Sequence, residues 1–383
     1  MHLKGTKFYV VVQNKWCMED LQIKLTGRKL KHLVRSHEKT AEAVNLVYVT
    51  DSENGIERKL ERDVFVYLLN RKKVKDFDTL ARIKSLAIPP AWTKVWICAD
   101  ERGHLQATGF DARNRKQYRY HPLWNVLRNH TKFFNLYDFG LALPQIRERL
   151  QTDLNKRGLS QEKVLAAVVS LMQCTCIRIG NGFYEKVNGS FGLTTLKDKH
   201  VTIKSHSISF SFKGKKGVYH DVTLKSKKLA RVVQACKDIP GKELFQYYNE
   251  EGERKSIDSG MVNSYIREIS QGDFTAKDFR TWAGSLHALS ALKELGCADT
   301  DAETKRRIVE ALDIVAKQLN NTRTVCKKYY VHPILLELYS DGRIEKYFSQ
   351  FEDTDSNPVE TDLNAEEKVL MKILEAHGRT VVV

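Results

Sequence analysis

The chain has 383 residues, 42% of them hydrophobic, which fits a globular protein of two or three domains and excludes a chain too polar to fold on its own. Lysine and arginine number 63 against 47 aspartate and glutamate residues, so the net charge is +16. This excess favours a polyanion such as nucleic acid as the partner, and a basic surface that is merely solvated is the alternative.

The N-terminal region carries short runs of regular structure. Residues 1–90 contain two β-like runs, Phe8–Val12 and Leu46–Thr50, and a stretch around Val64–Leu69 that we expect to be helical. These runs predict part of a small α+β domain, in which residues 1–45 form an extension of unassigned role. The run Phe8–Val12 is too brief for a signal sequence or a membrane span, so we expect neither secretion nor membrane anchoring.

Residues 95–120 have the pattern of a β-meander. Apolar side chains occupy every second position from Val95 to Ala99, which is the period of a strand. Turn-forming residues follow at Asp100–Gly103 and again at Asp111–Asn114. The sequence therefore predicts strands joined by tight turns.

The end of this meander interleaves basic and aromatic residues. The basic ones are Arg113, Arg115, Lys116 and Arg119. Cations suit contacts to phosphates, whereas Gln117 and the rings of Tyr118 and Tyr120 suit base edges or sugars. We therefore expect the four residues from Gln117 to Tyr120 to contact DNA, and a strand with one buried aromatic face is the alternative.

Helices are expected to dominate from about Leu123. Apolar residues recur with the period of a helix buried on one face at Val164, Leu165, Val168, Val169 and Met172. A β insertion then interrupts the helices. In it Ile208, Phe210 and Phe212 alternate with serine, the segment Lys213–Gly217 turns the chain, and Val218 begins a returning strand.

Helices are expected to return after Ser259. A long one is marked by an apolar face at Ile308, Leu312, Val315 and Leu319. The acidic segment 351–362 is a predicted linker, after which Asn364 and Glu367 have the spacing of a capping pair for a final helix.

Metal and nucleotide chemistry find no support in the sequence. The seven cysteines form no CxxC pair and no Cys/His cluster with zinc spacing, so we expect reduced, mostly buried thiols and no metal site. The GK dipeptides at Gly214 and Gly241 are followed by Lys216 and Glu243 instead of Ser or Thr, so there is no P-loop. We expect no cofactor and no use of ATP.

Four residues could together break and rejoin a DNA strand. Tyr330 offers a phenol, with a pKa of about 10, that leaves phosphorus far more readily than a sugar alcohol does, so a phosphotyrosyl bond is reversible. Arg178, Lys215 and Arg280 could neutralise the charge that builds on a phosphate during in-line displacement.

The segments that hold these residues are 176–201, 210–222, 274–285 and 319–333. In this order they resemble the type IB DNA topoisomerases, in particular the compact branch of bacteria, poxviruses and other large DNA viruses. The resemblance covers residues 94–333. It implies that Tyr330 attacks the scissile phosphate and forms a 3′-phosphotyrosyl bond, and it favours Tyr330 over Tyr329 because the family tyrosine stands two residues before a His-Pro pair.

The resemblance also implies roles for the basic residues. Arg178 and Arg280 would clamp the non-bridging oxygens, with ordinary salt bridges as the alternative. Lys215 would be the general acid to the leaving 5′-oxygen, although Lys213 and Lys216 compete for that role and a solvated turn is the alternative. Lys277 would join the proton relay.

The chain departs from the poxvirus pattern at two positions. Asn321 stands where the poxvirus enzymes have a histidine; bacterial relatives also have Asn there, and its amide N–H could still donate to a phosphate oxygen. Asn181 replaces a family lysine, which puts the sequence preference in doubt. Tyr184 matches a family tyrosine that contacts DNA.

The expected fold class is α+β: a β-rich N-terminal clamp domain (1–121), a mostly helical catalytic domain of the topoisomerase IB and tyrosine recombinase type with a β-hairpin insertion (122–350), and a C-terminal linker and helix (351–383). The resemblance implies a cytoplasmic, monomeric enzyme that closes around double-stranded DNA and relaxes supercoils without ATP. A bacterial source would place it at the nucleoid, and a viral one in the viral factory or virion. A tyrosine recombinase or a DNA-packaging protein without enzymatic activity is the alternative; the recombinases usually have His where this chain has Lys277.

Overall fold

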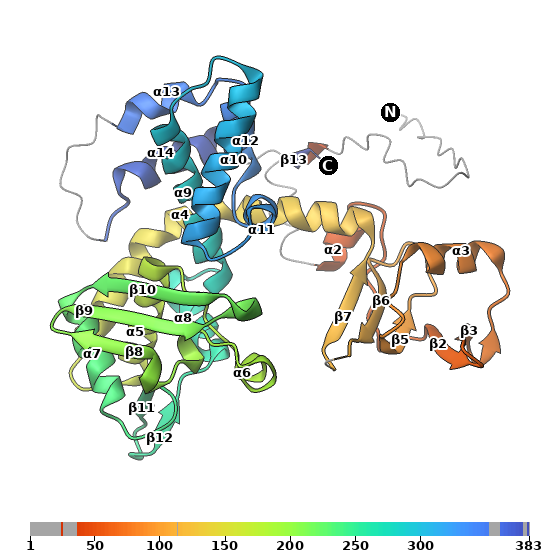
Figure 1. The fold of residues 1–383 in the computed structure, drawn as a ribbon, viewed down its shortest axis with the longest axis horizontal. Coiled ribbons are helices and arrows are strands. Elements are labelled where there is room, and N and C mark those ends of the chain that lie inside the picture. The colour runs from red at the N-terminus through yellow and green to blue at the C-terminus, as the bar shows by residue number, and fades with distance from the viewer. Residues whose placement is uncertain (1–23, 26–36, 113, 352–360, 378–380, 383) are drawn as a thin grey trace. The chain divides into compact units, whose positions relative to one another are not determined.

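A computed structural model of the chain divides it into two compact units, residues 1–127 with 380–383 and residues 128–379 (Figure 1). It describes residues 24–25, 37–112, 114–351, 361–377 and 381–382. The β-like run Phe8–Val12, Arg113 and most of the expected linker 351–362 lie outside the described residues.

The first unit is built on a six-stranded antiparallel sheet with strand order β4-β3-β2-β5-β6-β7. The strands are β2 (Ile56–Glu61), β3 (Val64–Leu69), β4 (Lys72–Lys73), β5 (Thr93–Ile97), β6 (Leu105–Phe110) and β7 (Lys116–Tyr120). Helices α2 (His37–Glu42) and α3 (Phe77–Ser85) and the strand pair β1 (Lys24–Leu25) and β13 (Val381–Val382) also belong to this unit. Ile83 of α3 packs with Ile56 and Ile97 of the sheet, so helix and sheet share one apolar core.

The segment Val64–Leu69 is strand β3, so the expected helix there is wrong. It pairs with β2 across a two-residue turn, Arg62 and Asp63, whose φ angles of 47° and 63° are both positive. Such a turn matches the twist of a two-stranded hairpin. A short apolar run cannot be assigned to helix or strand from its composition alone, and here the pairing with Ile56–Glu61 decides for the strand.

The β-meander expected over residues 95–120 is confirmed by β5, β6 and β7, which pair antiparallel in chain order. Its turns Asp100–Gly103 and Asp111–Asn114 are closed by backbone hydrogen bonds of 3.1 and 2.8 Å between their end residues. The run Leu46–Thr50 forms no regular strand, since Val47 makes only an isolated β-bridge.

The second unit is mostly helical. From Pro122 on, the described helices are α4 (Pro122–Leu154), α5 (Gln161–Thr175), α6 (Gly182–Asn188), α7 (Lys227–Lys237), α8 (Ser259–Ser270), α9 (Ala276–Leu295), α10 (Asp301–Gln318), α11 (Arg323–Tyr329), α12 (Pro333–Ser340), α13 (Glu345–Phe348) and α14 (Ala365–His377). The expected helices around Val164–Met172 and Ile308–Leu319 are confirmed as α5 and α10, and the apolar face of each lies in the core.

The expected β insertion is confirmed, and it contains one strand more than the predicted hairpin. Strands β8 (Val201–Lys204), β9 (Ser207–Lys213) and β10 (Tyr219–Lys225) form an antiparallel sheet in the order β10-β9-β8, packed against α5 and α7 (Figure 1). A small hairpin of β11 (Gln246–Tyr248) and β12 (Arg254–Ser256) follows. The alternating residues Ile208, Phe210 and Phe212 are all buried, as their period predicts.

The predicted capping pair at the start of α14 is also confirmed. The Asn364 side chain accepts a hydrogen bond from the Glu367 N–H at 2.8 Å, and the Glu367 carboxylate accepts one from the Asn364 N–H at 3.0 Å. Buried Glu367 also accepts hydrogen bonds from Arg147 of α4, at 2.6 and 2.9 Å, and from Trp282 of α9, at 3.1 Å. The final helix is therefore anchored to both α4 and α9.

The predicted α+β fold class, with a β-rich N-terminal part and a mostly helical remainder, is confirmed. In the part of the chain that the structure describes, no helix is both long and apolar enough to cross a lipid bilayer.

Candidate active site

Arg178 lies in a loop that follows helix α5. The helix ends at Thr175, and the φ of the next residue, Cys176, is 54°, a left-handed value that turns the chain out of the helix. The Arg178 carbonyl accepts a hydrogen bond from the Leu193 N–H at 2.9 Å. A Cβ built on Gly192 would lie 2.6 Å from that carbonyl oxygen, so only glycine allows this close approach. Backbone packing and hydrogen bonding therefore fix the position of Arg178.

Arg280 lies on helix α9, whose start is fixed by a capping box between Thr275 and Asp278. The Arg280 side chain is only 5% exposed. Its Nη1 donates to the Cys176 carbonyl, and its Nη2 donates to the Leu319 carbonyl at 2.9 Å. Among the described residues, the buried Nε has no hydrogen-bond partner. A buried guanidinium with an unused donor is well suited to bind an incoming anion.

Tyr330 directly follows helix α11, and its N–H donates to the Cys326 carbonyl at 2.9 Å. Helix α9 passes directly beside it. A Cβ built on Gly284 would lie 2.7 Å from the Tyr330 carbonyl oxygen, and the Ser285 hydroxyl donates to the same oxygen at 3.2 Å. The guanidinium carbon of Arg280 lies 5.1 Å from the centroid of the Tyr330 ring. One helix therefore positions both the arginine and the tyrosine.

Three cations act on the Tyr330 phenol. Burial alone would raise the pKa of Tyr330, but the charges of Arg280, Arg178 and Lys215 outweigh burial and hold that pKa below its ordinary value. Burial lowers the pKa of Arg178, and the charge of Arg280 lowers it further. The phenol is therefore easier to ionise than that of free tyrosine, and an anion between the two arginines would relieve their repulsion.

Asn321 lies beside Arg178, just after helix α10. Its backbone N–H donates to the Ala316 carbonyl at 2.9 Å. Its side-chain oxygen accepts a hydrogen bond from Arg178 Nη2 at 2.7 Å, and its Nδ2 donates to the Leu319 carbonyl over 3.4 Å. The amide thus orients Arg178, while its own N–H is in a long hydrogen bond that a better acceptor could replace.

Of the two lysines predicted to be catalytic, Lys215 acts electrostatically on Tyr330, whereas Lys277 shows no such interaction within the described residues. Lys215 is exposed in the short turn η3 (Lys215–Gly217) between β9 and β10, and it is one of the three cations that lower the pKa of Tyr330. Lys277 is exposed in the first turn of α9. Within the described ranges, no hydrogen bond or ion pair ties its ammonium group to the residues around Tyr330.

Sequence reasoning missed His220, which lies on β10 and is only 3% exposed. Burial, with a further contribution from the charges of Arg178 and Arg280, lowers the pKa of His220 to about 4. The sequence did indicate that His220 could be buried, because the strand alternation places it on the same face as Val218 and Val222. Nothing in that alternation, however, indicates that two arginines lie nearby.

In the first unit, the predicted DNA-contacting stretch from Gln117 to Tyr120 belongs to β7. The rings of Tyr118 and Tyr120 stack with their centroids 5.9 Å apart, and Tyr118 is 47% exposed. Hydrogen bonds to a carboxylate and to a carbonyl of the same unit orient Gln117 and Arg119. Tyr120 is half-buried and packs against the apolar cluster of Val49, Cys98 and Leu105, so the strand turns one ring toward the core while much of Tyr118 stays exposed.

Tyr184 lies on the short helix α6, in which no residue is buried. Its ring is 50% exposed and packs edge-on against the ring of Phe183, which is also exposed. Asn181 caps the helix by accepting a hydrogen bond from the Phe183 N–H at 2.9 Å. Exposed aromatic rings so close in sequence to Arg178 suit packing against sugars or bases.

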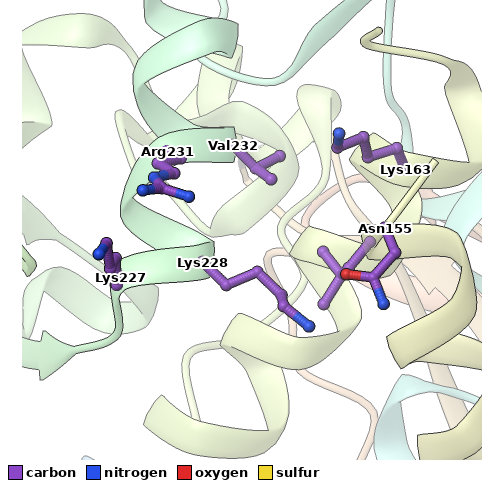
Figure 2. Close-up of a pocket in the computed structure, with 7 residues that line it drawn as sticks. Asn155, Lys163, Lys227, Lys228, Arg231 and Val232 are labelled. Carbon is purple, nitrogen blue, oxygen red and sulfur yellow. The ribbon is translucent and has the colours of Figure 1, made fainter. Parts of the chain in front are cut away.

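A basic pocket of about 430 Å³ lies elsewhere in the second unit. It is lined by Leu154, Asn155, Lys163, Lys227, Lys228, Arg231 and Val232. Figure 2 shows Lys228 extending toward Asn155, while Lys227 and Arg231 lie on the helix that carries Lys228, α7. None of the six predicted catalytic residues lines this pocket.

Comparison with known proteins gives a consistent result for both parts of the chain. The family model described as "Eukaryotic DNA topoisomerase I, catalytic core" matches residues 116–357, the segment that holds all six predicted catalytic residues. The model described as "Bacterial DNA topoisomerase IB, N-terminal domain" matches residues 64–111.

Individual relatives agree with the family models. The DNA topoisomerase 1B of Acanthamoeba polyphaga mimivirus is 31% identical over 341 residues, which cover 86% of this chain and 96% of that protein. The DNA topoisomerase I of Monkeypox virus is 26% identical over 238 residues, 61% of this chain and 72% of the viral protein. The DNA topoisomerase 1 of Candida albicans is 26% identical over 183 residues, 46% of this chain and 22% of the yeast protein.

Proposed function

The chain belongs to the type IB DNA topoisomerases, and we propose that it relaxes supercoiled DNA by cutting one strand through a transient 3′-phosphotyrosyl bond to Tyr330. The observation that carries the proposal is the grouping of Arg178, Arg280 and Asn321 around this tyrosine. Cations beside an ionisable phenol provide the electrostatics that in-line phosphoryl transfer needs.

The arginines bind the scissile phosphate. Arg280 is buried and has an unused Nε–H, and Arg178 is oriented by Asn321. Both guanidiniums stay charged at any physiological pH and can donate to non-bridging oxygens. On binding, the Asn321 amide exchanges its long hydrogen bond to the Leu319 carbonyl for one to phosphate. Charge on the phosphate is thus neutralised as it builds during attack.

The chemical step exchanges one phosphoester for another. The Tyr330 phenol loses its proton to solvent, which the neighbouring cations favour, and its oxygen attacks phosphorus. The bond from phosphorus to the 5′-oxygen breaks, and Lys215 donates a proton to that oxygen, assisted by Lys277 as part of the relay. After the cut strand has rotated about the intact one, the 5′-hydroxyl attacks in reverse. The phosphotyrosyl bond conserves the energy of the original linkage, so neither ATP nor a metal ion is required.

Duplex DNA is the proposed partner along a longer surface. Residues Gln117, Tyr118, Arg119 and Tyr120 on β7 and Tyr184 on α6 contact it. The proposed division is a clamp domain over 1–121, a catalytic domain over 122–350 and a C-terminal segment over 351–383, acting as a monomer that closes around the duplex. The place of action follows the substrate: the bacterial nucleoid, or the viral factory or virion.

The test is relaxation of supercoiled plasmid in EDTA without ATP, with topoisomers resolved on a gel. We expect relaxation by the wild-type chain and by Tyr329→Phe, the matched control at the adjacent, exposed tyrosine. Tyr330→Phe should be inactive while keeping the fold, as judged by circular dichroism. Relaxation by Tyr330→Phe would show that another residue is the nucleophile, and no relaxation by folded wild-type protein would refute the activity.

A further inference from the structure

The imidazole of His220 supports the turn that carries Lys215. His220 on β10 lies opposite Phe212 on β9, and the two rings stack with centroids 4.8 Å apart and 5° between their planes. A Cβ built on Gly214 would lie 2.5 Å from the Cδ2 and Nε2 atoms of His220. The backbone immediately before Lys215 therefore lies directly against this ring.

The opposite edge of the ring reaches a second part of the site. Its Nδ1 lies 3.2 Å from the side-chain nitrogen of Asn320, 100 residues away in sequence. Asn320 has a φ of 48°, and the next residue, Asn321, accepts the hydrogen bond from Arg178. One side chain thus connects the turn of Lys215 to the loop of Asn321.

Burial, aided by the charges of Arg178 and Arg280, keeps the His220 ring neutral and so preserves this hydrogen bond. Because the pKa of His220 is lowered to about 4, the ring is neutral near pH 7. A neutral ring with its proton on Nε2 accepts the amide proton of Asn320 at Nδ1, which an imidazolium could not do.

We propose that His220 is a positioning residue that couples the Lys215 turn to the Asn320–Asn321 loop and so aligns the general acid with the bound phosphate. The inference rests on the proposed role of Lys215 as the acid for the leaving 5′-oxygen. Lys215 is exposed in a short turn, so its ammonium depends on the backbone of that turn for its position. Tyr330 is held separately by α9 and α11. The loop is held by its own backbone, since the N–H groups of Asn320 and Asn321 donate to carbonyls of α10 at 3.3 and 2.9 Å. Loss of the coupling should therefore impair proton delivery more than attack.

A substrate with sulfur in place of the scissile 5′-oxygen distinguishes a defect in proton delivery from a defect in attack by Tyr330. A thiol has a pKa of about 8.5 and leaves as the thiolate without help from an acid, so a defect in proton delivery disappears on the sulfur substrate. Single-turnover cleavage rates are measured on both duplexes for the full-length wild type, His220→Phe, Asn320→Gly and Lys215→Ala. Phenylalanine keeps the ring packing at position 220, and glycine accepts the positive φ at position 320.

His200→Phe is the matched control. His200 is also buried, and its ring centroid lies 6.3 Å from that of the same Phe212. It differs in that its Nδ1 accepts the Lys197 N–H at 3.0 Å, which connects it to a different loop. A general loss of packing beside Phe212 would therefore affect both histidine variants, whereas loss of the coupling would affect His220→Phe alone.

On the oxygen duplex, His220→Phe and Asn320→Gly should cleave about 10- to 100-fold more slowly than wild type, the scale expected for a misplaced catalytic group. On the sulfur duplex both should come within about threefold of wild type, and His200→Phe should stay within that range on both duplexes. Equal losses on the two duplexes, or no loss on oxygen, would overturn the coupling. If the sulfur duplex restores the cleavage rate of neither Lys215→Ala nor the two coupling variants, Lys215 is not the general acid. If it restores the rate of Lys215→Ala alone, Lys215 remains the acid and only the coupling is refuted.

Discussion

Gly284 sets how closely helix α9 approaches Tyr330. A Cβ added there would lie 2.7 Å from the Tyr330 carbonyl oxygen and 2.8 Å from the Tyr330 Cβ, so backbone would have to move. We predict that Gly284→Ala displaces the nucleophile and slows single-turnover DNA cleavage by about 10- to 100-fold, since small misplacements of reacting groups are costly.

The control for this prediction is Gly182→Ala on α6. A Cβ at Gly182 would meet no atom within 4 Å, so that variant should retain its unfolding temperature, whereas Gly284→Ala should lower it. Wild-type cleavage by Gly284→Ala would show that the position of Tyr330 does not depend on this approach.

His220 should make the free energy of unfolding depend on pH between about pH 4 and pH 6.5. The pKa of His220 is about 4 in the folded chain and about 6.5 when the residue is unfolded. Between these values the unfolded chain binds a proton that the folded chain does not, so the free energy of unfolding falls as pH falls from 6.5 to 4. This one group accounts for a loss of up to about 3 kcal/mol.

The measurement is urea unfolding of wild type and His220→Phe between pH 7 and pH 4.5. Phenylalanine cannot bind the proton, so the stability advantage of the wild type over the variant should shrink as the pH falls. A stability difference that stays constant over this range would mean that His220 is not held neutral beside Arg178 and Arg280.

At the scale of elements, helix α9 positions the site and α14 holds α9. Arg280 and Gly284 both lie on α9, and Trp282 of the same helix donates to Glu367 of α14 at 3.1 Å. Glu367 also pairs with Arg147 of α4 at 2.6 Å, and its side chain is only 3% exposed. The C-terminal helix lies beyond residues 116–357, the range of the matched catalytic-core model, yet it supports the helix on which the site depends.

Removing the Glu367 carboxylate should therefore destabilise the second unit. We predict that Glu367→Ala lowers the free energy of unfolding by about 3 kcal/mol, because Arg147, charged and largely buried, loses its carboxylate partner and keeps a hydrogen bond to the Asp362 carbonyl. Glu375→Ala removes an exposed carboxylate of the same helix, which accepts one hydrogen bond from the Tyr137 hydroxyl at 3.2 Å, and should lower it by no more than about 1 kcal/mol. Chemical denaturation measures both, and equal effects of the two substitutions would contradict the anchoring role.

Helices and strands whose apolar residues recur at a regular spacing could be predicted from the sequence. Contacts between residues far apart in the sequence could not. The alternation at Ile208–Phe212 and the capping pair at Asn364 are local patterns, so both were predicted correctly. The run Val64–Leu69 was misassigned because its strand partner, not its own composition, determines its structure. The predicted site residues came from a resemblance. His220 was missed because its relation to Arg178, Arg280 and Asn320 exists only in the folded chain.

At the scale of the whole molecule, the excess of positive charge predicts that the affinity for DNA depends strongly on salt. The net charge is +16, and the predicted DNA-contacting residues are distributed over both compact units. A protein that neutralises several phosphates releases their counterions, so its affinity falls steeply with salt.

We predict that Tyr330→Phe, which binds without cutting, loses about 10³-fold or more of its affinity for linear duplex between 50 and 200 mM KCl. Fluorescence anisotropy with a labelled duplex measures this dependence. A loss of less than about tenfold would mean that few phosphates are contacted and would contradict the proposed clamp.

The covalent intermediate tests the central claim most directly. A duplex with a nick just 3′ of the cleavage site releases its short 5′-hydroxyl fragment, so the enzyme stays attached to DNA, and mass spectrometry of the digested adduct identifies the modified residue. We predict a 3′-phosphoryl nucleotide on Tyr330, formed in EDTA without ATP and distinguished from one on Tyr329 by fragmenting the peptide that contains both tyrosines. Attachment to Tyr329, to any other residue or through a 5′-phosphate would contradict the mechanism.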